Sequence, residues 1–417
     1  MPFPMMPTYS RDTQVTVRPF TRQVDGEEVI IGVVETGVFL AVPPEAVELL
    51  EHFSQGKNVG QVADFYQQRY GEVLDIDDFL ELLETKGIVE SLGEGGALSA
   101  KAQPVRPQAP RVRYHFANFP QSLAQRIFSR PVLAGSFILI GLALAAMIGN
   151  PSLAPHASDF YFPDHRAFSW ILLTAISYAG IFVHEMGHLV ATRALGINSR
   201  MGISNRLWYL VAETDLTGLW ALPKRKRYLP FLAGVLIDAV SGSLLVLALF
   251  ALGHHWLTLP VFTVRMLRAL VLSYWLRILW QSFLFVRTDF YFVIVSLLNC
   301  KNLLKDTEDF VRNLARRVAP SLRFVDQSGI PAAERRVIRL YSVLWVGGRI
   351  MAFVVLFSIT VPVAISYIRS LHGVFRAGYS ANPYNFIDCV VLSAAFLIPV
   401  IMGFVLWVGS LVRRERT

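Results

Sequence analysis

Long apolar runs occupy most of the chain beyond residue 130, and they limit its possible folds more than any other feature. The six runs lie at about 131–149, 168–195, 229–253, 262–298, 340–366 and 388–411, the fourth being long and broken. Each is long enough to cross a hydrocarbon core of ~30 Å as a helix. Because 53% of the 417 residues are hydrophobic, a soluble domain would expose too much apolar surface. The sequence therefore predicts a mainly α-helical, polytopic membrane protein, with about six spans in residues 131–417.

The basic residues between these runs predict how the chain is oriented. Arg and Lys number six in 101–130, six in 196–228, nine in 299–339 and three after the last run. The alternate loops carry one in 150–167, none in 254–261 and two in 367–387. Loops rich in Arg and Lys stay on the cytoplasmic side of a membrane. We therefore expect a multi-pass protein with both termini in the cytoplasm.

Residues 23–92 are typical of a small soluble domain. Segment 29–40 predicts two short strands around a turn at Glu35-Thr36-Gly37. Apolar residues at i, i+3, i+4 and i+7 predict three short helices, near 46–53, 59–66 and 76–83. This pattern indicates a winged helix-turn-helix-like α+β domain. An N-terminal arm (1–22) precedes it, and a linker with a juxtamembrane segment (93–130) follows it.

The charge of this domain argues against nucleic acid as its partner. Residues 41–95 hold twelve Asp and Glu against three Lys and Arg, and the third helix alone carries five acidic residues in 75–84. Such a face would repel phosphate. An exposed strand edge beside a helix can instead pair with an added peptide strand. We expect a peptide partner, with a merely solubilising acidic domain as the alternative.

The same domain resembles a known family. The runs that carry the resemblance are Thr36-Gly37-Val38-Phe39-Leu40, Pro44-Glu45-Ala46-Val47-Glu48-Leu49-Leu50 and Phe79-Leu80-Glu81-Leu82-Leu83-Glu84-Thr85-Lys86-Gly87. They are similar to the PqqD-like domains, over about seventy residues. The resemblance implies that the domain recognises the leader peptide of a ribosomally made, modified peptide.

A metal-binding pattern stands inside the second apolar run, as His184-Glu185-Met186-Gly187-His188. Residues four apart share one face of a helix, so His184 and His188 can bind one metal ion, with Glu185 beside them as the general base. Ionisable groups are costly in hydrocarbon and usually mark a functional site there. The pattern predicts a catalytic Zn²⁺ site within the membrane, against the alternative of two hydrogen-bonded packing histidines.

A catalytic zinc ion usually has three protein ligands, so a third must come from elsewhere. Asp289 lies in Arg287-Thr288-Asp289-Phe290-Tyr291, a polar break in the fourth apolar run, and is the better candidate. Asp238 in the third run could orient one of the metal-binding residues without binding the metal itself. Its alternative role is a polar contact between spans.

These residues carry a second resemblance. The HExxH motif together with Asp289 is similar to the site-2 protease class of intramembrane zinc proteases. Segments Thr214-Asp215-Leu216-Thr217-Gly218-Leu219-Trp220 and Ala233-Gly234 resemble peptide zinc metalloproteases of bacterial peptide-maturation clusters. The wider class holds its third ligand in an Asn…Pro…Leu-Asp-Gly context, which is missing around Asp289. Gln281 or Asn302 could replace the absent oxyanion-stabilising partner.

Residues 201–222 alternate between apolar and polar and are too polar to span a membrane cleanly. In the resembled class, a hairpin here lies in the membrane and offers an edge strand to the substrate. An edge strand can hold an unwound peptide, whereas a helical substrate hides its peptide bonds. The alternative is an ordinary cytoplasmic loop.

Together these features favour an intramembrane zinc endopeptidase of the bacterial cytoplasmic membrane. It would cut a membrane-associated peptide or a single-span protein, with the N-terminal domain capturing the substrate. The alternative is a non-enzymatic, zinc-containing peptide receptor, export factor or immunity protein. Structural zinc normally has four protein ligands, so a fourth ligand from the outer loop, where Asp164 and His165 lie, would favour that alternative.

Overall fold

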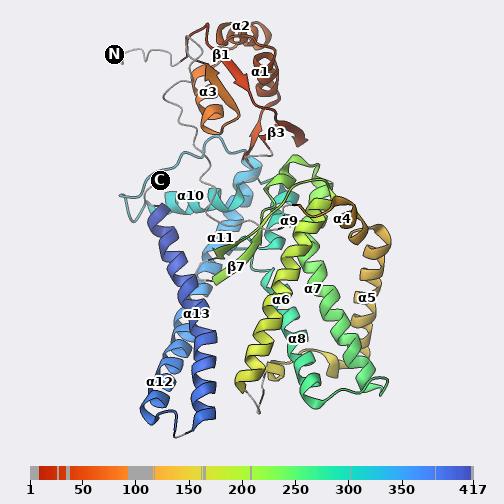
Figure 1. Ribbon diagram of the computed structural model, residues 1–417. Coiled ribbons are helices and arrows are strands. Elements are labelled where there is room, and N and C mark those ends of the chain that lie inside the picture. Colours follow the sequence, from red (N-terminus) through yellow and green to blue (C-terminus); the bar gives the residue numbers. More distant parts are fainter. Residues whose placement is uncertain are drawn as a thin grey trace. The chain divides into compact units, whose positions relative to one another are not determined.

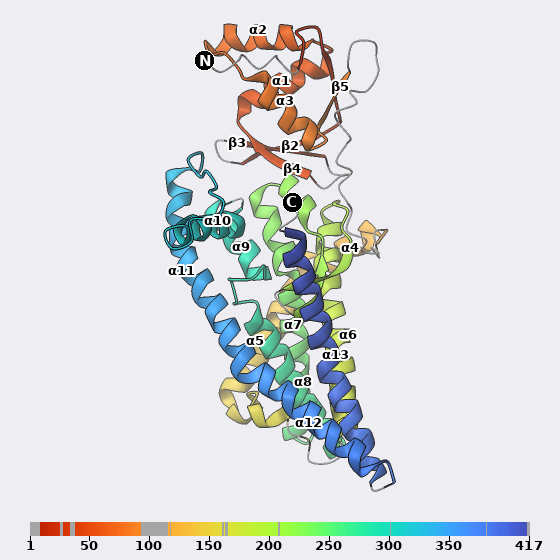
Figure 2. The same ribbon diagram turned by 90° about the vertical axis from the view of Figure 1, so that its left-hand side faces the viewer.

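The computed structural model describes residues 9–25, 28–33, 38–92, 116, 118–160, 162, 166–206, 209–300, 302–380 and 382–414. The chain divides into two compact units (Figures 1 and 2). Residues 1–114 and 215–227 make up the first, and residues 115–214 and 228–417 the second. Each unit is described by itself.

The first unit is a small α+β domain, in line with the prediction. Its elements are β1 (Gln14–Val17), β2 (Thr21–Asp25), β3 (Glu28–Val33), β4 (Val38–Val42), α1 (Pro44–Ser54), α2 (Val59–Tyr70), α3 (Ile76–Thr85) and β5 (Val89–Leu92). The two strands expected in 29–40 are β3 and β4, and the three expected helices are present. The turn expected at 35–37 lies outside the described residues. Local signals explain the helix ends: Asn58 and Gln61 form a capping box at the start of α2, and Gly71 ends it in the left-handed region at φ 75°.

The strands of this unit form two antiparallel sheets, with orders β2-β3-β4 and β1-β5. Strand β1 lies in segment 1–22, which is predicted as an N-terminal arm. Only Val15 and Val17 alternate inward there, which is too short a pattern to predict a strand. Strand β5 at the far end of the domain supplies its pairing partner, and no local pattern could reveal that partner.

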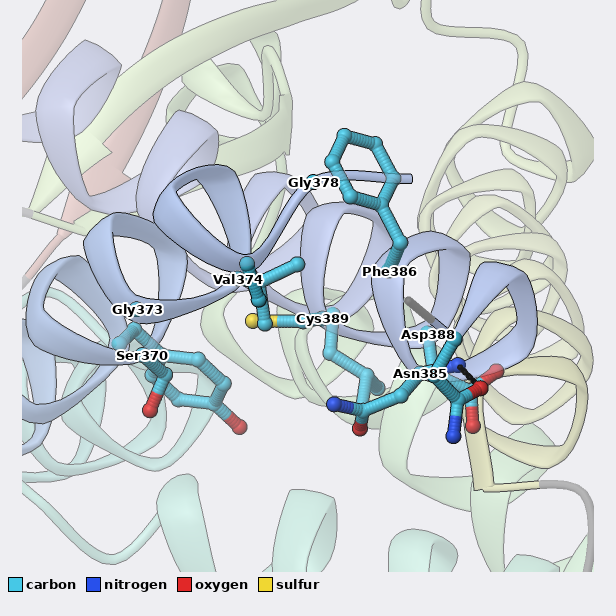
Figure 3. A pocket seen from close by; sticks show the side chains of 12 residues that line it. Ser370, Gly373, Val374, Gly378, Asn385, Phe386, Asp388 and Cys389 are labelled. Carbon is cyan, nitrogen blue, oxygen red and sulfur yellow. Dashed lines mark hydrogen bonds between the residues drawn. The ribbon is translucent and has the colours of Figure 1, made fainter. Parts of the chain in front are cut away.

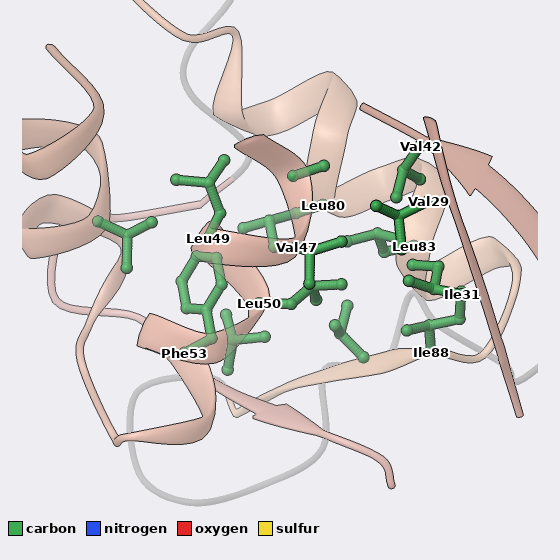
Figure 4. Close-up of a cluster of buried hydrophobic side chains, with 14 of the residues drawn as sticks. Val29, Ile31, Val42, Val47, Leu49, Leu50, Phe53, Leu80, Leu83 and Ile88 are labelled. Carbon is green, nitrogen blue, oxygen red and sulfur yellow. The ribbon is translucent and has the colours of Figure 1, made fainter. Parts of the chain in front are cut away.

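The core of the first unit lies where its strands and helices meet. Figure 4 shows apolar side chains of β3 (Val29, Ile31) facing those of α1 and α3. Leu50, Leu80 and Leu83 are completely buried. The 3.6-residue apolar period in the helices and the buried strand residues therefore build one contiguous core.

The second unit is mainly helical. Its elements are α4 (Gln121–Ile127), α5 (Arg130–Gly149), two short 3-10 turns (Pro151–Leu153 and Ala157–Phe160), α6 (Arg166–Ala194), β6 (Met201–Arg206), β7 (Tyr209–Thr214), most of α7 (Lys224–Gly253), α8 (Val261–Trp280), α9 (Asp289–Leu298), α10 (Leu303–Ala315), α11 (Ala332–Val355), a π-turn (Leu356–Thr360), α12 (Val361–Ala377) and α13 (Pro383–Arg414). Five described helical segments are long and apolar enough to cross a membrane: 121–149, 168–194, 224–253, 332–377 and 383–409. This number is compatible with a multi-pass membrane protein.

The fourth predicted span, 262–298, is not among these five. It consists of two separate helices, α8 and α9, joined by the irregular segment 281–288. Helix α8 is 20 residues long but carries Arg265, Arg268 and Arg277, which lower its apolar character. It nevertheless packs within the helical unit (Figure 1), since Leu270 joins a buried cluster with Leu173 of α6, and Val271 another with Val246 of α7.

The alternating segment 201–222 contains the β-hairpin of β6 and β7. The two strands pair antiparallel, from Met201 opposite Thr214 to Arg206 opposite Tyr209. They form a two-stranded sheet that lies against α6 and α13. A hairpin rather than an irregular loop therefore follows the helix that carries the HExxH motif.

A carboxyl group outside the apolar helices has an environment unfavourable to its charge. Burial, and then the carboxylates of Glu334 and Asp309, raise the pKa of Asp306 on α10 to about 6. A carboxyl whose pKa is higher in the folded protein favours folding only while protonated. This contribution is present below the unfolded value near 3.8 and is lost as the pH rises through about 6.

We predict that Asp306→Asn raises the melting temperature of the detergent-solubilised protein more at pH 7.5 than at pH 4.5, because Asn lacks the charge. Asp326→Asn is a control of opposite sign, since hydrogen bonds from Ser328 lower the pKa of Asp326. That variant should lose stability to nearly the same extent at both pH values, because both lie above the ordinary value of 3.8. Equal gains for Asp306→Asn at the two pH values would contradict the prediction.

Candidate metal centre

The HExxH motif lies on α6, inside the candidate span 168–194. His184 and His188 are 6% and 2% exposed, so neither side chain is in contact with bulk solvent. Their Nε2 atoms are 3.2 Å apart, as expected for two imidazoles on one helical face. His184, Glu185 and His188 together form a group that could hold a metal ion.

Hydrogen bonds on the far side of each ring determine which nitrogen faces the centre. Nδ1 of His184 lies 2.8 Å from Oδ2 of Asp238, and Nδ1 of His188 lies 2.7 Å from the carbonyl oxygen of Pro230. Both partners are acceptors, so each Nδ1 carries the proton and donates. Each Nε2 is then left with a free lone pair, which is the arrangement of metal-binding histidines.

Asp289 completes a triangle with these two nitrogens. Its Oδ2 lies 3.1 Å from Nε2 of His184 and 3.2 Å from Nε2 of His188. Ligand atoms at 2.0–2.1 Å from a tetrahedral zinc ion are themselves about 3.3 Å apart. The three spacings therefore fit a single tetrahedral cation. Three electron-pair donors at this distance would repel one another unless a cation or a proton lay between them.

The polar break before α9 explains why Asp289 reaches this position. Asp289 is the first residue of α9, and its backbone N–H donates to Oε1 of Gln281 at 3.1 Å. Gln281, one of the two suggested oxyanion-stabilising residues, thus holds the backbone of Asp289 at the start of α9. Asn302, the other, is exposed at the start of α10. Asp238, suggested as an orienting residue, is completely buried and bonds His184.

Helix α7 approaches the two imidazoles closely through Gly234. A Cβ at this position would lie closer than 3.0 Å to Nε2 of both His184 and His188. Gly187 of α6 is similarly tight, because its Cβ would meet Ile237 of α7. The two glycines let α6 and α7 pack with almost no space between them, and Gly234 leaves open the volume that the three donor atoms share.

Glu185 does not join the triangle but has a partner of its own. Its Oε2 lies 2.7 Å from Oγ1 of Thr214, the last residue of β7, and the same hydroxyl is 3.0 Å from the Glu185 carbonyl oxygen. Glu185 belongs to the group that could bind a metal. The hydroxyl of Thr214 donates to this carboxylate, whereas Oδ2 of Asp289 lies 3.1–3.2 Å from the two imidazole nitrogens. Sequence reasoning missed the contacts of Thr214 and Gly234, although both residues lie in segments that carry the second resemblance.

A separate cavity lies between α12 and α13, with a volume of about 520 Å³. Figure 3 shows Ser370, Asn385, Asp388 and Cys389 among the side chains that line it. None of the three donor residues of the candidate metal centre contributes to its wall. The cavity is therefore not part of this centre.

Comparison with known proteins does not identify the chain. No family model, curated protein or solved structure matches it. The site geometry must therefore carry any functional assignment.

We predict that Gly234→Ala weakens metal binding about tenfold or more, since its methyl group would enter the volume between the two Nε2 atoms. The measurement is zinc affinity of the purified protein, by competition with a chromophoric chelator. Gly253→Ala on the same helix, where a Cβ would meet nothing within 4 Å, is the matched control. Wild-type affinity in Gly234→Ala would show that α7 stands further from the histidines.

Proposed function

We propose that this protein is an intramembrane zinc endopeptidase. The observation that carries the proposal is the triangle of His184 Nε2, His188 Nε2 and Asp289 Oδ2, with sides of 3.1–3.2 Å. It lies on buried faces of apolar helices, with a carboxylate beside it. The resemblance to the site-2 protease class supports the same assignment.

Each residue of the centre has a role in this proposal. His184, His188 and Asp289 would hold the zinc ion. When bound, zinc would supply Lewis-acid chemistry, lowering the pKa of a water molecule so that it can be deprotonated near neutral pH. Glu185 accepts the proton of that water and passes it to the leaving amine. The hydroxyl of Thr214 holds the Glu185 carboxylate in place for both transfers.

In this proposal, the β6–β7 hairpin holds the substrate peptide near the catalytic base. A transmembrane helix hides its peptide bonds in its own hydrogen bonds and cannot be cut until it unwinds. A strand edge can pair with an unwound segment of substrate and keep it extended. Because Thr214 ends β7 and bonds Glu185, a peptide held along the hairpin would be led toward the catalytic base.

The membrane arrangement that we propose has six crossings, with α8 as a crossing in addition to the five apolar segments. Both termini then lie in the cytoplasm, as the basic loops indicate, and the membrane is the bacterial cytoplasmic membrane. The N-terminal unit, which resembles PqqD-like domains, captures the peptide and raises its concentration at the bilayer. The substrate is a peptide of ribosomal origin under maturation, with a single-span regulator as the second substrate class.

The non-enzymatic alternative, a receptor, export factor or immunity protein with structural zinc, requires a fourth protein ligand. Asp164 and His165, suggested as its source, lie outside the described residues. The hydrogen bond that positions Glu185 favours the enzyme, because a structural site has no use for a held base.

We expect Glu185→Gln to bind zinc like the wild type but to cut no peptide, because Gln cannot accept the proton. The assay places hydrophobic single-span peptides in vesicles with the protein and detects cleavage by mass spectrometry. Wild type stripped by a chelator should lose cleavage and regain it when zinc is added. Cleavage by Glu185→Gln at the wild-type rate would exclude the proposed mechanism.

Thr214→Val keeps the side-chain shape but removes the hydroxyl that holds Glu185. We expect turnover to fall about tenfold, a part of the roughly 10²–10⁴ that a general base contributes, with unchanged zinc content. Thr217→Val, whose hydroxyl bonds Asp215 instead, is the control. A loss of zinc in Thr214→Val would instead assign Thr214 to the support of the metal ligands.

A further inference from the structure

The side chain of Arg277 on α8 contacts Asp238, the carboxylate that hydrogen-bonds His184. Its Nε donates to Oδ2 of Asp238 at 3.2 Å, and its Nη2 pairs with Oδ1 of the same carboxylate. Oδ2 of Asp238 also accepts the hydrogen bond from Nδ1 of His184 at 2.8 Å. The guanidinium, the carboxylate and the imidazole thus form one continuous chain of contacts from α8 through α7 to α6. This chain ends at the nitrogen that faces the metal centre.

The surroundings of the guanidinium hold it on several sides. Its Nη1 donates to the carbonyl oxygen of Ser177 at 3.3 Å, and its Cζ lies 4.4 Å from the ring centroid of Tyr274. Gly180, one helical turn before His184, provides the space for it: a Cβ there would come closer than 3.0 Å to Nη1. The absence of a side chain at Gly180 therefore leaves room for the guanidinium in its present position.

The energetics of this pair argue for a role beyond packing. Asp238 is completely buried, and the side chain of Arg277 is 18% exposed. Removing two charges from water is costly, and replacing such a pair by apolar residues is often neutral or stabilising. Among apolar helices, a retained charged group usually serves a function.

We propose that Arg277 is a positioning residue of the metal centre. Its two-pronged contact fixes both oxygens of Asp238, whereas a single donor would leave the carboxylate free to rotate. The fixed Oδ2 holds the His184 ring, so that Nε2 points at the place shared with His188 and Asp289. The inference rests on the proposed function only for the identity of the cation, because it concerns metal affinity and not peptide cleavage.

The test measures zinc affinity of the full-length protein in detergent, by chelator competition, for Arg277→Met, Arg277→Lys and Gly180→Ala. We expect Arg277→Met to bind zinc about 10- to 100-fold more weakly, as for the loss of groups that orient a metal ligand. Arg277→Lys keeps the positive charge but cannot donate to both carboxylate oxygens in the same way. Its zinc affinity should lie between those of Arg277→Met and the wild type. Gly180→Ala keeps every charge and should weaken binding by displacing the guanidinium. It also tests the proposal if Arg277→Met does not fold.

Two further comparisons separate positioning from general packing. Arg268→Met removes another arginine of α8, whose Nη1 bonds the Ser152 carbonyl oxygen, and should bind zinc like the wild type. In an Asp238→Asn background, Arg277→Met should weaken binding less than about threefold further, since Arg277 acts through Asp238. The absorption spectrum of the Co²⁺-loaded protein should also change in Arg277→Met, because the His184 ring is no longer held in place.

Wild-type zinc affinity in Arg277→Met would overturn the proposal. So would a double variant whose loss of affinity equals the product of the losses of the two single variants. Failure of the proposed function gives a different result: the wild type would bind zinc through His184 and cut no peptide. In that case the affinity measurements would still decide the role of Arg277.

Discussion

Three lone pairs that converge on one point among apolar helices are the constraint on which the rest of the site depends. His184, His188 and Asp289 each direct an acceptor atom at a common centre, at mutual distances of 3.1–3.2 Å. In water such groups would separate and be solvated. Here the helices hold them together, and a cation or a proton between them would relieve the resulting repulsion. Any affinity of the site for a metal would thus follow from how the surrounding elements pack.

Helix α7 places a glycine against one side of the two imidazoles and hydrogen-bond acceptors against the other. Gly234 lets the backbone of α7 approach the imidazoles without occupying the space between them. On the other side, Asp238 and the carbonyl oxygen of Pro230 accept the Nδ1 protons. Helix α7 therefore supplies both the open volume and the orientation of the rings. Its sequence around 230–238 is as important to the centre as the HExxH motif on α6.

Some of this could be predicted from the sequence, and some could not. The pairing of His184 with His188 follows from helical spacing, which is local, and Asp289 was singled out because a polar break interrupts an apolar run. The fold of the N-terminal unit followed from helical periodicity, except for β1, whose partner is about seventy residues away. The fourth expected span is not among the five apolar segments, because the three arginines of α8 lower its apolar character. Thr214, Gly234 and Arg277 act through tertiary contacts between elements, and no spacing rule reports these.

The position of Asp289 has a consequence for the stability of the whole helical unit. It stands 101 residues after His188 in the chain, so a cation shared by the two closes a very large ring. A cation that binds the folded arrangement but not the unfolded chain would stabilise that arrangement by mass action. Chelation would then release α9 and the segment before it from their hold on α6.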